Sequence, residues 1–520
     1  MLPEREALLR AAAEVARQAA APSPAHPAPS ISVALFDTQG LLALETSGSP
    51  ERTGVAPDAA TVYRIASMSK SFLAAAALRA EEEGLFDLDA PLSEVLPYVS
   101  AVRWQGRPQP ITARMLLSNR SGLPEDNAWG DRHLGISVPE FEQIVAAGLR
   151  ATFPADTVYQ YSNVGFTLVG RALERTTHMP IEEYVRSRLL EPLGLGDTAY
   201  DRRELPGRSV APGWRSFDSG RSWVPEPFLE PGALGCIGGL FSTAGDVATW
   251  ARFLVAAFPS AASRLSPEEL DRFDRVLSPA SRRAMQVGRT PIHTLSGARA
   301  GALVSSAYAL GLESDIHRDL GAFAGHSGGL PGFSSHMRWH LATGIGAVVF
   351  ANTDNFPARE VATEALERFL SEAGAPAAEV PLWPETVAAI REVDAAIRSA
   401  RSLAEVADRF APNVFQDRPL KGRDRAAAQL LKDLGGVQPA LPNVEARLLA
   451  APTPAEASWR IPCARGDAIV GIRLMGVEPP LVEGFWIGRG DRTGTRLITD
   501  TPKVTDGYLP VVSAGPGVPR

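Results

Sequence analysis

Apolar and polar positions along the chain repeat with periods that predict helices and strands. Residues 2–20 space their apolar positions at helical intervals among Glu and Arg, which predicts an amphipathic helix. ISVALFDTQGLLALETSG has two apolar runs around Thr38-Gln39-Gly40, which is typical of a hairpin. A long helix is predicted over residues 67–83, with Gly84 as its C-cap.

The middle of the chain, from about residue 110 to 270, has the pattern of helices and loops. Strand patterns return in SSAYALGLES, FSSHMRWHL and GIGAVVFAN, and PAREVATEALERFLSEA follows as an amphipathic helix. Strands at both ends with helices between them predict one sheet built from both ends of a domain, with a helical region inserted.

A second domain is predicted beyond GAPAAEVPLWP, whose composition indicates a linker. Helical patterns at 385–400, 403–410 and 424–434 precede four strand patterns, VEARLLA, EASWRIPC, DAIVGIRLM and LVEGFWIG. This order predicts a small α+β domain with an antiparallel sheet. The expected divisions are an N-terminal helix and linker that pack on the main domain (1–29), the main domain (30–373), a linker (374–384), the C-terminal domain (385–505) and a tail (506–520).

The length of 520 residues supports two domains, because single cores rarely grow beyond about 250–300 residues. The net charge of -7 and the scattered arginines argue against nucleic acid or an anionic membrane as partner. No apolar run reaches the roughly 18 residues of a membrane span, and acidic residues open the N-terminal helix, unlike a signal peptide. We therefore expect a cytoplasmic protein. Cys236 and Cys463 fit no metal or redox spacing and are expected to be buried free thiols.

The segment Gly325-His326-Ser327-Gly328-Gly329 matches the G-x-S-x-G pattern of a nucleophile elbow. An elbow requires a helix directly after the serine, but Leu330-Pro331-Gly332 follows and prevents one. His336 and His340 come later in a strand-like run with no acid between Ser327 and either of them, and no third ligand makes them a metal pair. Ser327 is therefore not expected to be the nucleophile.

Lys70 is the one lysine in the first 420 residues of a chain that has only four lysines among its 52 basic residues. A guanidinium cannot lose its proton in a protein, whereas a partly buried ammonium can, so Lys70 is a candidate general base. Ser67 lies three residues earlier, on the same helical face, and can pass its hydroxyl proton to Lys70. Ser-x-x-Lys alone is a weak signal.

A neutral Lys70 near pH 7 requires its pKa to fall by about three units, so other polar groups should converge on it. In VYQYSNVGF, Tyr161 and Asn163 alternate with Ser162 and share one side of an extended loop. Tyrosine can relay protons to a leaving group, and an asparagine amide can orient both Lys70 and a substrate carbonyl. Tyr159 has no asparagine two residues later and is expected only to pack.

Ser67-x-x-Lys70, Tyr161-x-Asn163 and His326-Ser327-Gly328, in this order, resemble the three motifs of the serine β-lactamase-like superfamily. This superfamily includes class C β-lactamases, DD-peptidases, D-aminopeptidases and family VIII esterases. LFDLDAPLSEVLP, ITARMLLSNRSGLP and GGLFSTAGDVATWARFL are also similar to it, and the resemblance covers about residues 30–370. It implies a β-lactamase/transpeptidase-like domain, with an antiparallel sheet flanked by terminal helices, an all-α region, and the site between them.

The resemblance also implies site roles. Ser67 would attack the substrate, Lys70 and Tyr161 would move the proton, and Asn163 would orient, with His326 completing the catalytic set. No metal or cofactor is implied.

The remaining implied residues belong to the walls of the site. The backbone N–H groups of Ser67 and Gly329 would form the oxyanion hole. Ser327 and Gly328 would line the substrate cleft on an edge strand.

Two departures from the family pattern stand out. Class C β-lactamases and DD-carboxypeptidases usually have lysine where this chain has His326, and a histidine that titrates near 6.5 is mostly neutral at pH 7. The common H-T-S-G-L-P stretch is Asn-Arg-Ser-Gly-Leu-Pro here, beginning at Asn119, a change whose effect the sequence leaves open.

Our leading interpretation is a serine hydrolase that forms an acyl-enzyme on Ser67 with small peptides, amides or esters, with D-stereospecificity as an option. Two alternatives stay open: a penicillin-binding-protein-type thioesterase or acyltransferase that cyclises peptides, and an acylated sensor without turnover. His326 and the expected cytoplasmic location disfavour a β-lactamase or DD-carboxypeptidase. The expected partner is the small substrate, and homo-oligomerisation is left open.

Overall fold

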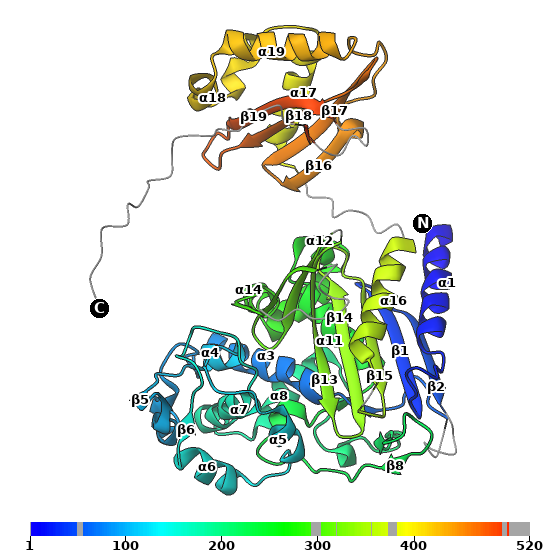
Figure 1. Ribbon diagram of the computed structural model, residues 1–520, viewed down its shortest axis with the longest axis vertical. Coiled ribbons are helices and arrows are strands. Elements are labelled where there is room, and N and C mark those ends of the chain that lie inside the picture. The colour runs from blue at the N-terminus through cyan, green and yellow to red at the C-terminus, as the bar shows by residue number, and fades with distance from the viewer. Residues whose placement is uncertain are drawn as a thin grey trace, which may run out of the picture. The chain divides into compact units, whose positions relative to one another are not determined.

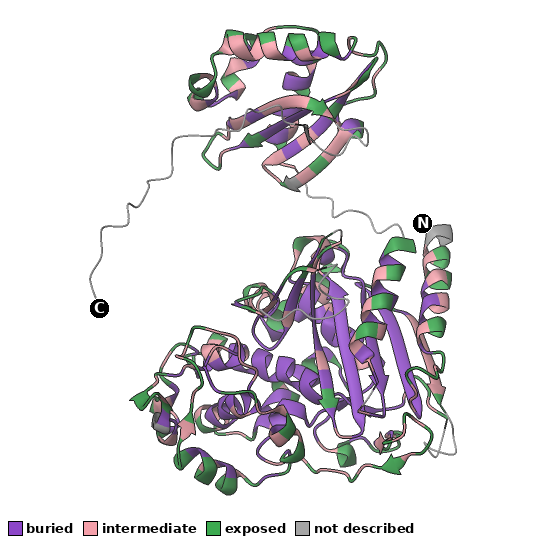
Figure 2. Ribbon diagram, viewed as in Figure 1, coloured by how far each residue is buried: buried purple, intermediate pink, exposed green. Residues whose placement is uncertain are grey.

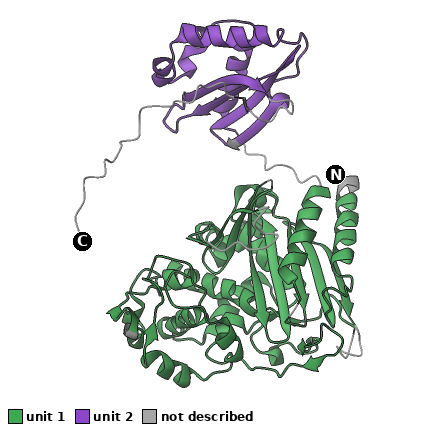
Figure 3. Ribbon diagram, in the orientation of Figure 1, with its two compact units in different colours: residues 1–378 green, residues 379–520 purple. Residues whose placement is uncertain are grey.

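The chain divides into two units, residues 1–378 and 379–520, each with its own hydrophobic core (Figure 3). The computed structural model describes residues 2–48, 56–292, 303–318, 320–354, 356–372, 382–490 and 497–498. The division falls within the predicted linker at 374–384. Most of that linker and the predicted tail at 506–520 lie outside the described residues.

An antiparallel sheet organises the first unit (Figure 1). Its N-terminal strands form the predicted hairpin, and β1 also pairs with β15, which joins the two ends of the domain. The sheet is therefore built from both ends of the domain, as the strand patterns predicted. Within the described residues the strand order is β10 (Thr290–Pro291), β11 (Leu303–Tyr308), β12 (Glu313–His317), β13 (Gly321–Leu330), β14 (Phe333–His340), β15 (Gly346–Ala351), β1 (Ser30–Asp37) and β2 (Gly40–Gly48).

Helices cover both faces of this sheet, so β1, β14 and β15 are buried along their whole length (Figure 2). The helices α1 (Leu2–Ala19) and α16 (Ala358–Glu372) pack against each other and against the sheet through one apolar cluster. Helix α11 (Ala244–Val255) contacts the same strands through a different cluster. Fully buried strands need an apolar layer on each side, and these helices supply both layers.

The inserted helical region surrounds α3 (Ser69–Glu82), whose residues from Ser69 to Leu78 are all buried. Its run of four alanines, 74–77, lets α7, α8 and α10 pack closely around it. No helix in the described residues is long and apolar enough to cross a membrane. The other helices of the region are α4 (Ala113–Leu117), α5 (Asn127–Arg132), α6 (Val138–Ala146), α7 (Asn163–Thr177), α8 (Ile181–Val185), α9 (Glu191–Leu193), α10 (Gly235–Gly238), α12 (Pro259–Ala262), α13 (Pro267–Val276) and α14 (Pro279–Ala284).

Short strands form three small sheets apart from the main one. Two of them, β3 and β9, pair just before the predicted nucleophile. Both cysteines are buried and free, as predicted. The short strands are β3 (Tyr63–Arg64), β4 (Val102–Trp104), β5 (Arg107–Pro108), β6 (Leu149–Arg150), β7 (Trp214–Arg215), β8 (Val224–Pro225) and β9 (Phe241–Ser242).

One strand pattern, SSAYALGLES, covers two strands instead of one. Strands β11 and β12 are separated by a turn in which Gly311 has φ +72°. A Cβ at this position would lie 2.7 Å from the carbonyl oxygen of Lys70 and 2.7 Å from the Cβ of Ala74. Glycine is needed here both for the left-handed backbone and for the close approach of the turn to α3.

The second unit is an α+β domain, as predicted. Its antiparallel sheet has the order β16 (Leu448–Thr453), β17 (Glu456–Cys463), β18 (Gly466–Leu474), β19 (Val482–Gly490) and β20 (Leu497–Ile498). Helix α18 was not predicted, and α19 begins four residues before its predicted start. The helical segments are α17 (Pro384–Arg398), a 3-10 segment (Leu403–Arg409), α18 (Pro412–Asp417) and α19 (Leu420–Asp433).

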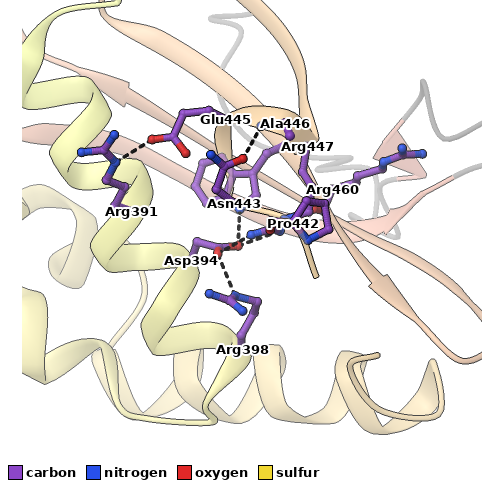
Figure 4. A network of polar contacts seen from close by, with 10 residues as sticks. Arg391, Asp394, Arg398, Pro442, Asn443, Glu445, Ala446, Arg447 and Arg460 are labelled. Carbon is purple, nitrogen blue, oxygen red and sulfur yellow. Dashed lines mark hydrogen bonds and ion pairs between the residues drawn. The ribbon is translucent and has the colours of Figure 1, made fainter. Parts of the chain in front are cut away.

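A buried ionic network ties α17 to the sheet of this unit (Figure 4). Asp394 accepts hydrogen bonds from both terminal nitrogens of Arg447, at 3.0 and 2.5 Å, and from Trp459 Nε1 at 2.9 Å. Arg398, one turn later on α17, donates to the same carboxylate at 2.8 Å. Asp394 is 1% exposed, so its charge is stabilised by these donors and not by water.

Candidate active site

Ser67 lies in a 3-10 turn, Ala66–Met68, that leads directly into α3. The residue before it, Ala66, has φ +51°, a left-handed conformation that costs a non-glycine residue roughly 1–2 kcal/mol. The turn is fixed by buried hydrogen bonds: Ser69 Oγ donates to the Ala66 carbonyl at 2.7 Å, and Ser335 Oγ donates to that of Ile65 at 2.8 Å. The surrounding structure therefore holds the strained backbone at Ser67.

Lys70 is fully buried one helical turn after Ser67. Its Nζ donates to Ser67 Oγ at 2.9 Å and to the carbonyl oxygen of Ile237 at 3.2 Å. Burial lowers the pKa of Lys70 to about 8, against the opposing charges of Asp131 and Asp126. At pH 7 roughly a tenth of the lysine is then neutral, which makes it available as a base.

Tyr161 approaches Ser67 and Lys70, and Asn163 follows it at the start of the next helix. The Lys70 Nζ lies 5.0 Å from the centroid of the Tyr161 ring. Burial raises the pKa of Tyr161 well above its ordinary value, and a hydrogen bond with Ser67 opposes the rise. The sequence pattern placed Asn163 in an extended loop, but in the structure it is the first residue of α7. Its Nδ2 donates to Asn127 Oδ1 at 3.0 Å.

Two residues that the sequence did not single out for a role position this loop and helix. Asp126 accepts hydrogen bonds from the backbone N–H groups of Asn163, at 2.6 Å, and Val164, at 2.9 Å. Asn119 Oδ1 accepts from the N–H of Ser162 at 3.1 Å, and its carbonyl accepts from Gln160 at 2.9 Å. Asn119, one of the two departures from the family pattern, therefore fixes the backbone on both sides of Tyr161. These contacts join residues about 40 positions apart, so no local pattern could reveal them.

Strand β13 passes directly beside the turn that carries Ser67. A Cβ on Gly328 would lie 2.3 Å from the carbonyl oxygen of Ile65 and 2.2 Å from Ser335 Oγ. Only glycine permits this approach. The exposed neighbour, Gly329, differs, because a Cβ there would meet nothing within 4 Å.

The N–H of Gly329 points away from β14, and the ladder explains why. The backbone N–H of Leu341 donates to the carbonyl of Ala322, so Ala322 belongs to a hydrogen-bonded pair of the β13–β14 ladder. Such pairs alternate along an antiparallel ladder, so every second residue after Ala322 also bonds to β14. Gly328 and Leu330 fall on these positions, and Gly329 does not. On the other side, β12 pairs with β13 only as far as Gly325. Strand β13 is therefore inside the sheet for its first half and an edge from His326 onward. The Gly329 N–H has no strand partner within the described part of the chain.

His326 is 2% exposed and has partners at both ring nitrogens. Its Nδ1 contacts the Ser327 carbonyl, which can only accept, so Nδ1 carries the proton and Nε2 accepts from the Tyr308 hydroxyl at 2.9 Å. Burial lowers the pKa of His326 to about 4, so the ring is neutral over the whole range of pH 5–8. Tyr308, which the sequence placed only in a strand, is thus a direct partner of a predicted site residue.

Ser327 is turned away from this group. Its Oγ lies 2.8 Å from Nδ1 of His336, the residue opposite it on β14. Side chains alternate between the two faces of a strand, so Ser327 and His336 lie on the face opposite to His326. The structure thus brings together Ser67, Lys70, Tyr161, His326 and Gly328, with Asn163 two residues after Tyr161 at the start of α7. The predicted contact of Ser327 with substrate stays a prediction.

Metal-binding groups are sparse in the described part of the chain. Glu81, Asp87 and Asp89 form the one cluster there with ligand atoms close enough to share an ion. Arg114 already bridges Glu81 and Asp89, with distances of 2.7–2.9 Å. This cluster is therefore an ion-pair network on the surface of the helical region.

Comparison with known proteins extends the likeness beyond the motifs. A model of the family described as Beta-lactamase matches residues 12–370. The curated protein "Unguisins hydrolase ungD'" of Aspergillus campestris is 26% identical over 314 residues, which cover 58% of this chain and 54% of that protein. The chain spans about half of that relative's length.

Solved structures share the fold at low sequence identity. The octameric penicillin-binding protein homologue from Pyrococcus abyssi has a TM-score of 0.56 at 18% identity, over 88% of this chain and 96% of that chain. The D-stereospecific amidohydrolase from Streptomyces sp. has a TM-score of 0.53 at 23% identity, over 68% and 98%. They confirm the predicted β-lactamase/transpeptidase-like fold. Because the family model also matches more than half of the chain, the protein belongs to the Beta-lactamase family.

Proposed function

We propose that this protein is a serine hydrolase that forms an acyl-enzyme on Ser67 with small peptide, amide or ester substrates. The observation that carries the proposal is the 2.9 Å contact between Lys70 Nζ and Ser67 Oγ at a fully buried lysine. A lysine exposed to water, with a pKa of about 10.4, stays protonated near pH 7. Burial brings the pKa of Lys70 to about 8, close to the range in which a general base works best.

Acylation follows from this geometry. Neutral Lys70 takes the hydroxyl proton as Ser67 Oγ attacks the substrate carbonyl carbon. The oxygen of the tetrahedral intermediate takes up the negative charge beside the N–H groups of Ser67 and Gly329, and one such donor is worth about 3–4 kcal/mol. Tyr161, which contacts Ser67 and lies beside Lys70, passes the proton to the leaving amine or alcohol as the carbonyl reforms.

Deacylation reverses the roles. Water attacks the ester on Ser67, its proton passes to the Lys70–Tyr161 pair, and Ser67 Oγ leaves as a hydroxyl. An amine in place of water would give acyl transfer, so product analysis separates hydrolysis from the cyclising alternative. The D-stereospecific amidohydrolase from Streptomyces sp., which shares this fold, makes D-amino acid derivatives the first compounds to test. Both enantiomers are compared, as p-nitroanilides and p-nitrophenyl esters.

A fluorophosphonate probe tests the nucleophile directly. Attack by the serine oxygen on phosphorus displaces fluoride and adds the phosphonyl mass to one residue. We expect peptide mapping to place the label on Ser67, and we expect Ser67→Ala to abolish labelling. Ser327→Ala is the matched control, since Ser327 bonds to His336 on the other sheet face. A label on Ser327 would overturn the proposal.

A further inference from the structure

Helix α5 (Asn127–Arg132) packs against Asn163, and the contact defines which of its residues face the site. Asn127 accepts the hydrogen bond from Asn163 Nδ2, and a Cβ on Gly130 would lie 2.8 Å from that same nitrogen. Residues at i, i+3 and i+4 share one face of a helix. Asp131 is four residues after Asn127 and adjacent to Gly130, so it lies on the face of α5 that contacts Asn163.

The carboxylate of Asp131 has no partner of its own. Among the described residues it takes part in no hydrogen bond and no ion pair, although it is only partly exposed. The nearby Asp126 is different, because it caps the start of α7. Arg132 is also engaged, through its ion pair with Glu226. A partly buried acid without a cation is unfavourable unless something else neutralises it.

The charge of this carboxylate acts on two of the reactive groups. Among the charges acting on Lys70, that of Asp131 is the strongest, and it also acts on Tyr161. Burial raises the pKa of Asp131 to about 6, with Lys70 and Arg132 lowering it and Asp126 raising it further. Among the described residues no ion pair joins Lys70 to Asp131, and the Lys70 Nζ bonds instead to Ser67 and Ile237.

A second acceptor beside Asp131 is also unused. The Oδ1 atom of Asn163 is buried and without a hydrogen-bond partner, and Asn163 itself is 0% exposed. The amide orientation follows from its network: Asn163 Nδ2 donates to Asn127, whose own Nδ2 donates to Glu125 at 3.2 Å. Two acceptors without donors therefore belong to the contact between α5 and the start of α7, and the charge of one of them acts on Lys70.

We propose that Asp131, with Asn163 Oδ1, binds the ammonium group of the substrate, so the preferred substrates are aminoacyl amides and esters with a free amine. An ammonium offers three donors and a positive charge, which matches one carboxylate and one amide oxygen. In an aminoacyl substrate this group is one carbon from the carbonyl that Ser67 attacks. The inference rests on the proposed acylation of Ser67.

Matched substrates test the subsite. Alanine p-nitroanilide and its N-acetyl derivative, each as the D and L enantiomer, differ in charge at the amine. At pH 7 the free amine, with a pKa of about 7.7–8.0, and Asp131 are both mostly charged. We expect Asp131→Asn to lower kcat/KM for the free-amine substrate about tenfold to a hundredfold, mainly through KM, and to change the acetylated substrate less than about threefold. The exposed Asp87→Asn is the control for loss of one negative charge.

An electrostatic role through Lys70 predicts a different result. Without the charge of Asp131, the pKa of Lys70 falls, and the acid limb of the pH–rate profile moves to lower pH for both substrates alike. Equal changes for free-amine and acetylated substrates, or no change for either, would overturn the ammonium subsite.

Binding provides a measurement that does not depend on turnover. In a Ser67→Ala background, calorimetry should show that alaninamide binds more tightly than N-acetylalaninamide, and that adding Asp131→Asn removes the difference. Equal affinities before that addition would contradict the subsite. Failure of the fluorophosphonate to label Ser67 would instead contradict the proposed function, whatever the binding results.

Discussion

Two buried side chains near Ser67 show how burial alone produces different chemistry at different residues. Burial lowers the pKa of Lys70 to about 8 and that of His326 to about 4. The first change brings a base into the working range, because lysine begins near 10.5. The second change leaves His326 uncharged near pH 7, because the ordinary pKa of histidine, 6.5, falls still further. His326 thus supplies no fixed positive charge between pH 5 and 8.

Replacing Lys70 with arginine should separate charge from basicity. The guanidinium keeps the charge but cannot lose its proton, so we expect the rate of acylation to fall about 10²- to 10⁴-fold. Stopped-flow measurement with p-nitrophenyl esters gives the rate, and circular dichroism checks the fold. The same substitution at exposed Lys421 is the control. A Lys70→Arg enzyme that keeps more than about a tenth of the wild-type rate would show that Lys70 acts as an electrostatic group.

The neutral state of His326 has a consequence for acid stability. The pKa is lower in the folded chain than the ordinary 6.5, so the unfolded chain binds the proton more readily between pH 6.5 and 4. The contribution of this residue to stability is therefore present above pH 6.5 and lost as the pH falls, by about 2 kcal/mol at pH 5. Urea unfolding at pH 7 and 5 should show that His326→Gln loses less stability than wild type. Exposed His26→Gln should behave as wild type, and an identical loss in all three proteins would refute the buried, neutral histidine.

At the scale of elements, the site is assembled where β13, α3 and α7 meet. Strand β13 changes from an inner strand to an edge at His326, because β12 stops pairing at Gly325. This is how a strand in the middle of a sheet can still expose the N–H of Gly329. Helix α7 brings Asn163 to the same place because Asp126 and Ser162 cap its first turn.

Adjacent glycines of β13 provide a matched test of this packing. Gly328→Ala places a Cβ against Ile65 O and Ser335 Oγ, so we expect a loss of about 1–3 kcal/mol in stability and slower labelling of Ser67. The Cβ that Gly329→Ala adds would meet nothing within 4 Å, so this variant should leave the free energy of unfolding nearly unchanged. Chemical denaturation of both variants measures the difference. Equal stabilities would mean that β13 does not press against the turn of Ser67.

At the scale of the whole molecule, each unit has its own apolar clusters. All the predicted catalytic residues lie in the first unit. The buried network around Asp394 belongs entirely to the second. We therefore expect a defect in that network to stay within residues 379–520.

Asp394→Asn should destabilise the second unit by about 3–5 kcal/mol, because Arg447 loses its buried counter-charge. Hydrogen exchange measured by mass spectrometry should then increase across residues 384–490 and stay unchanged in the sheet of the first unit. Labelling of Ser67 should continue at the wild-type rate. Asp433→Asn, on the exposed end of α19, is the control. Faster exchange in both units would show that they unfold as one.

The sequence by itself determined the features that depend on neighbours along the chain. The i, i+3 spacing of Ser67 and Lys70 survives in the structure because a helical turn enforces it. The hairpin at Gly40, the long helix after Ser67 and the order of elements in both units follow from local periodicity in the same way. The proline and glycine after Ser327 were enough to exclude an elbow there.

Tertiary structure alone decided what depends on contacts between distant segments. Asn163 starts a helix because Asp126, 37 residues earlier, accepts its N–H. His326 is neutral because the packed chain buries it, which lowers its pKa. Ser327 faces His336 because the register of β13 on β14 places them opposite each other. The partnerless carboxylate of Asp131 appears only when α5 packs on Asn163. The charge state of a side chain depends on its desolvation, and desolvation is a property of the packed chain.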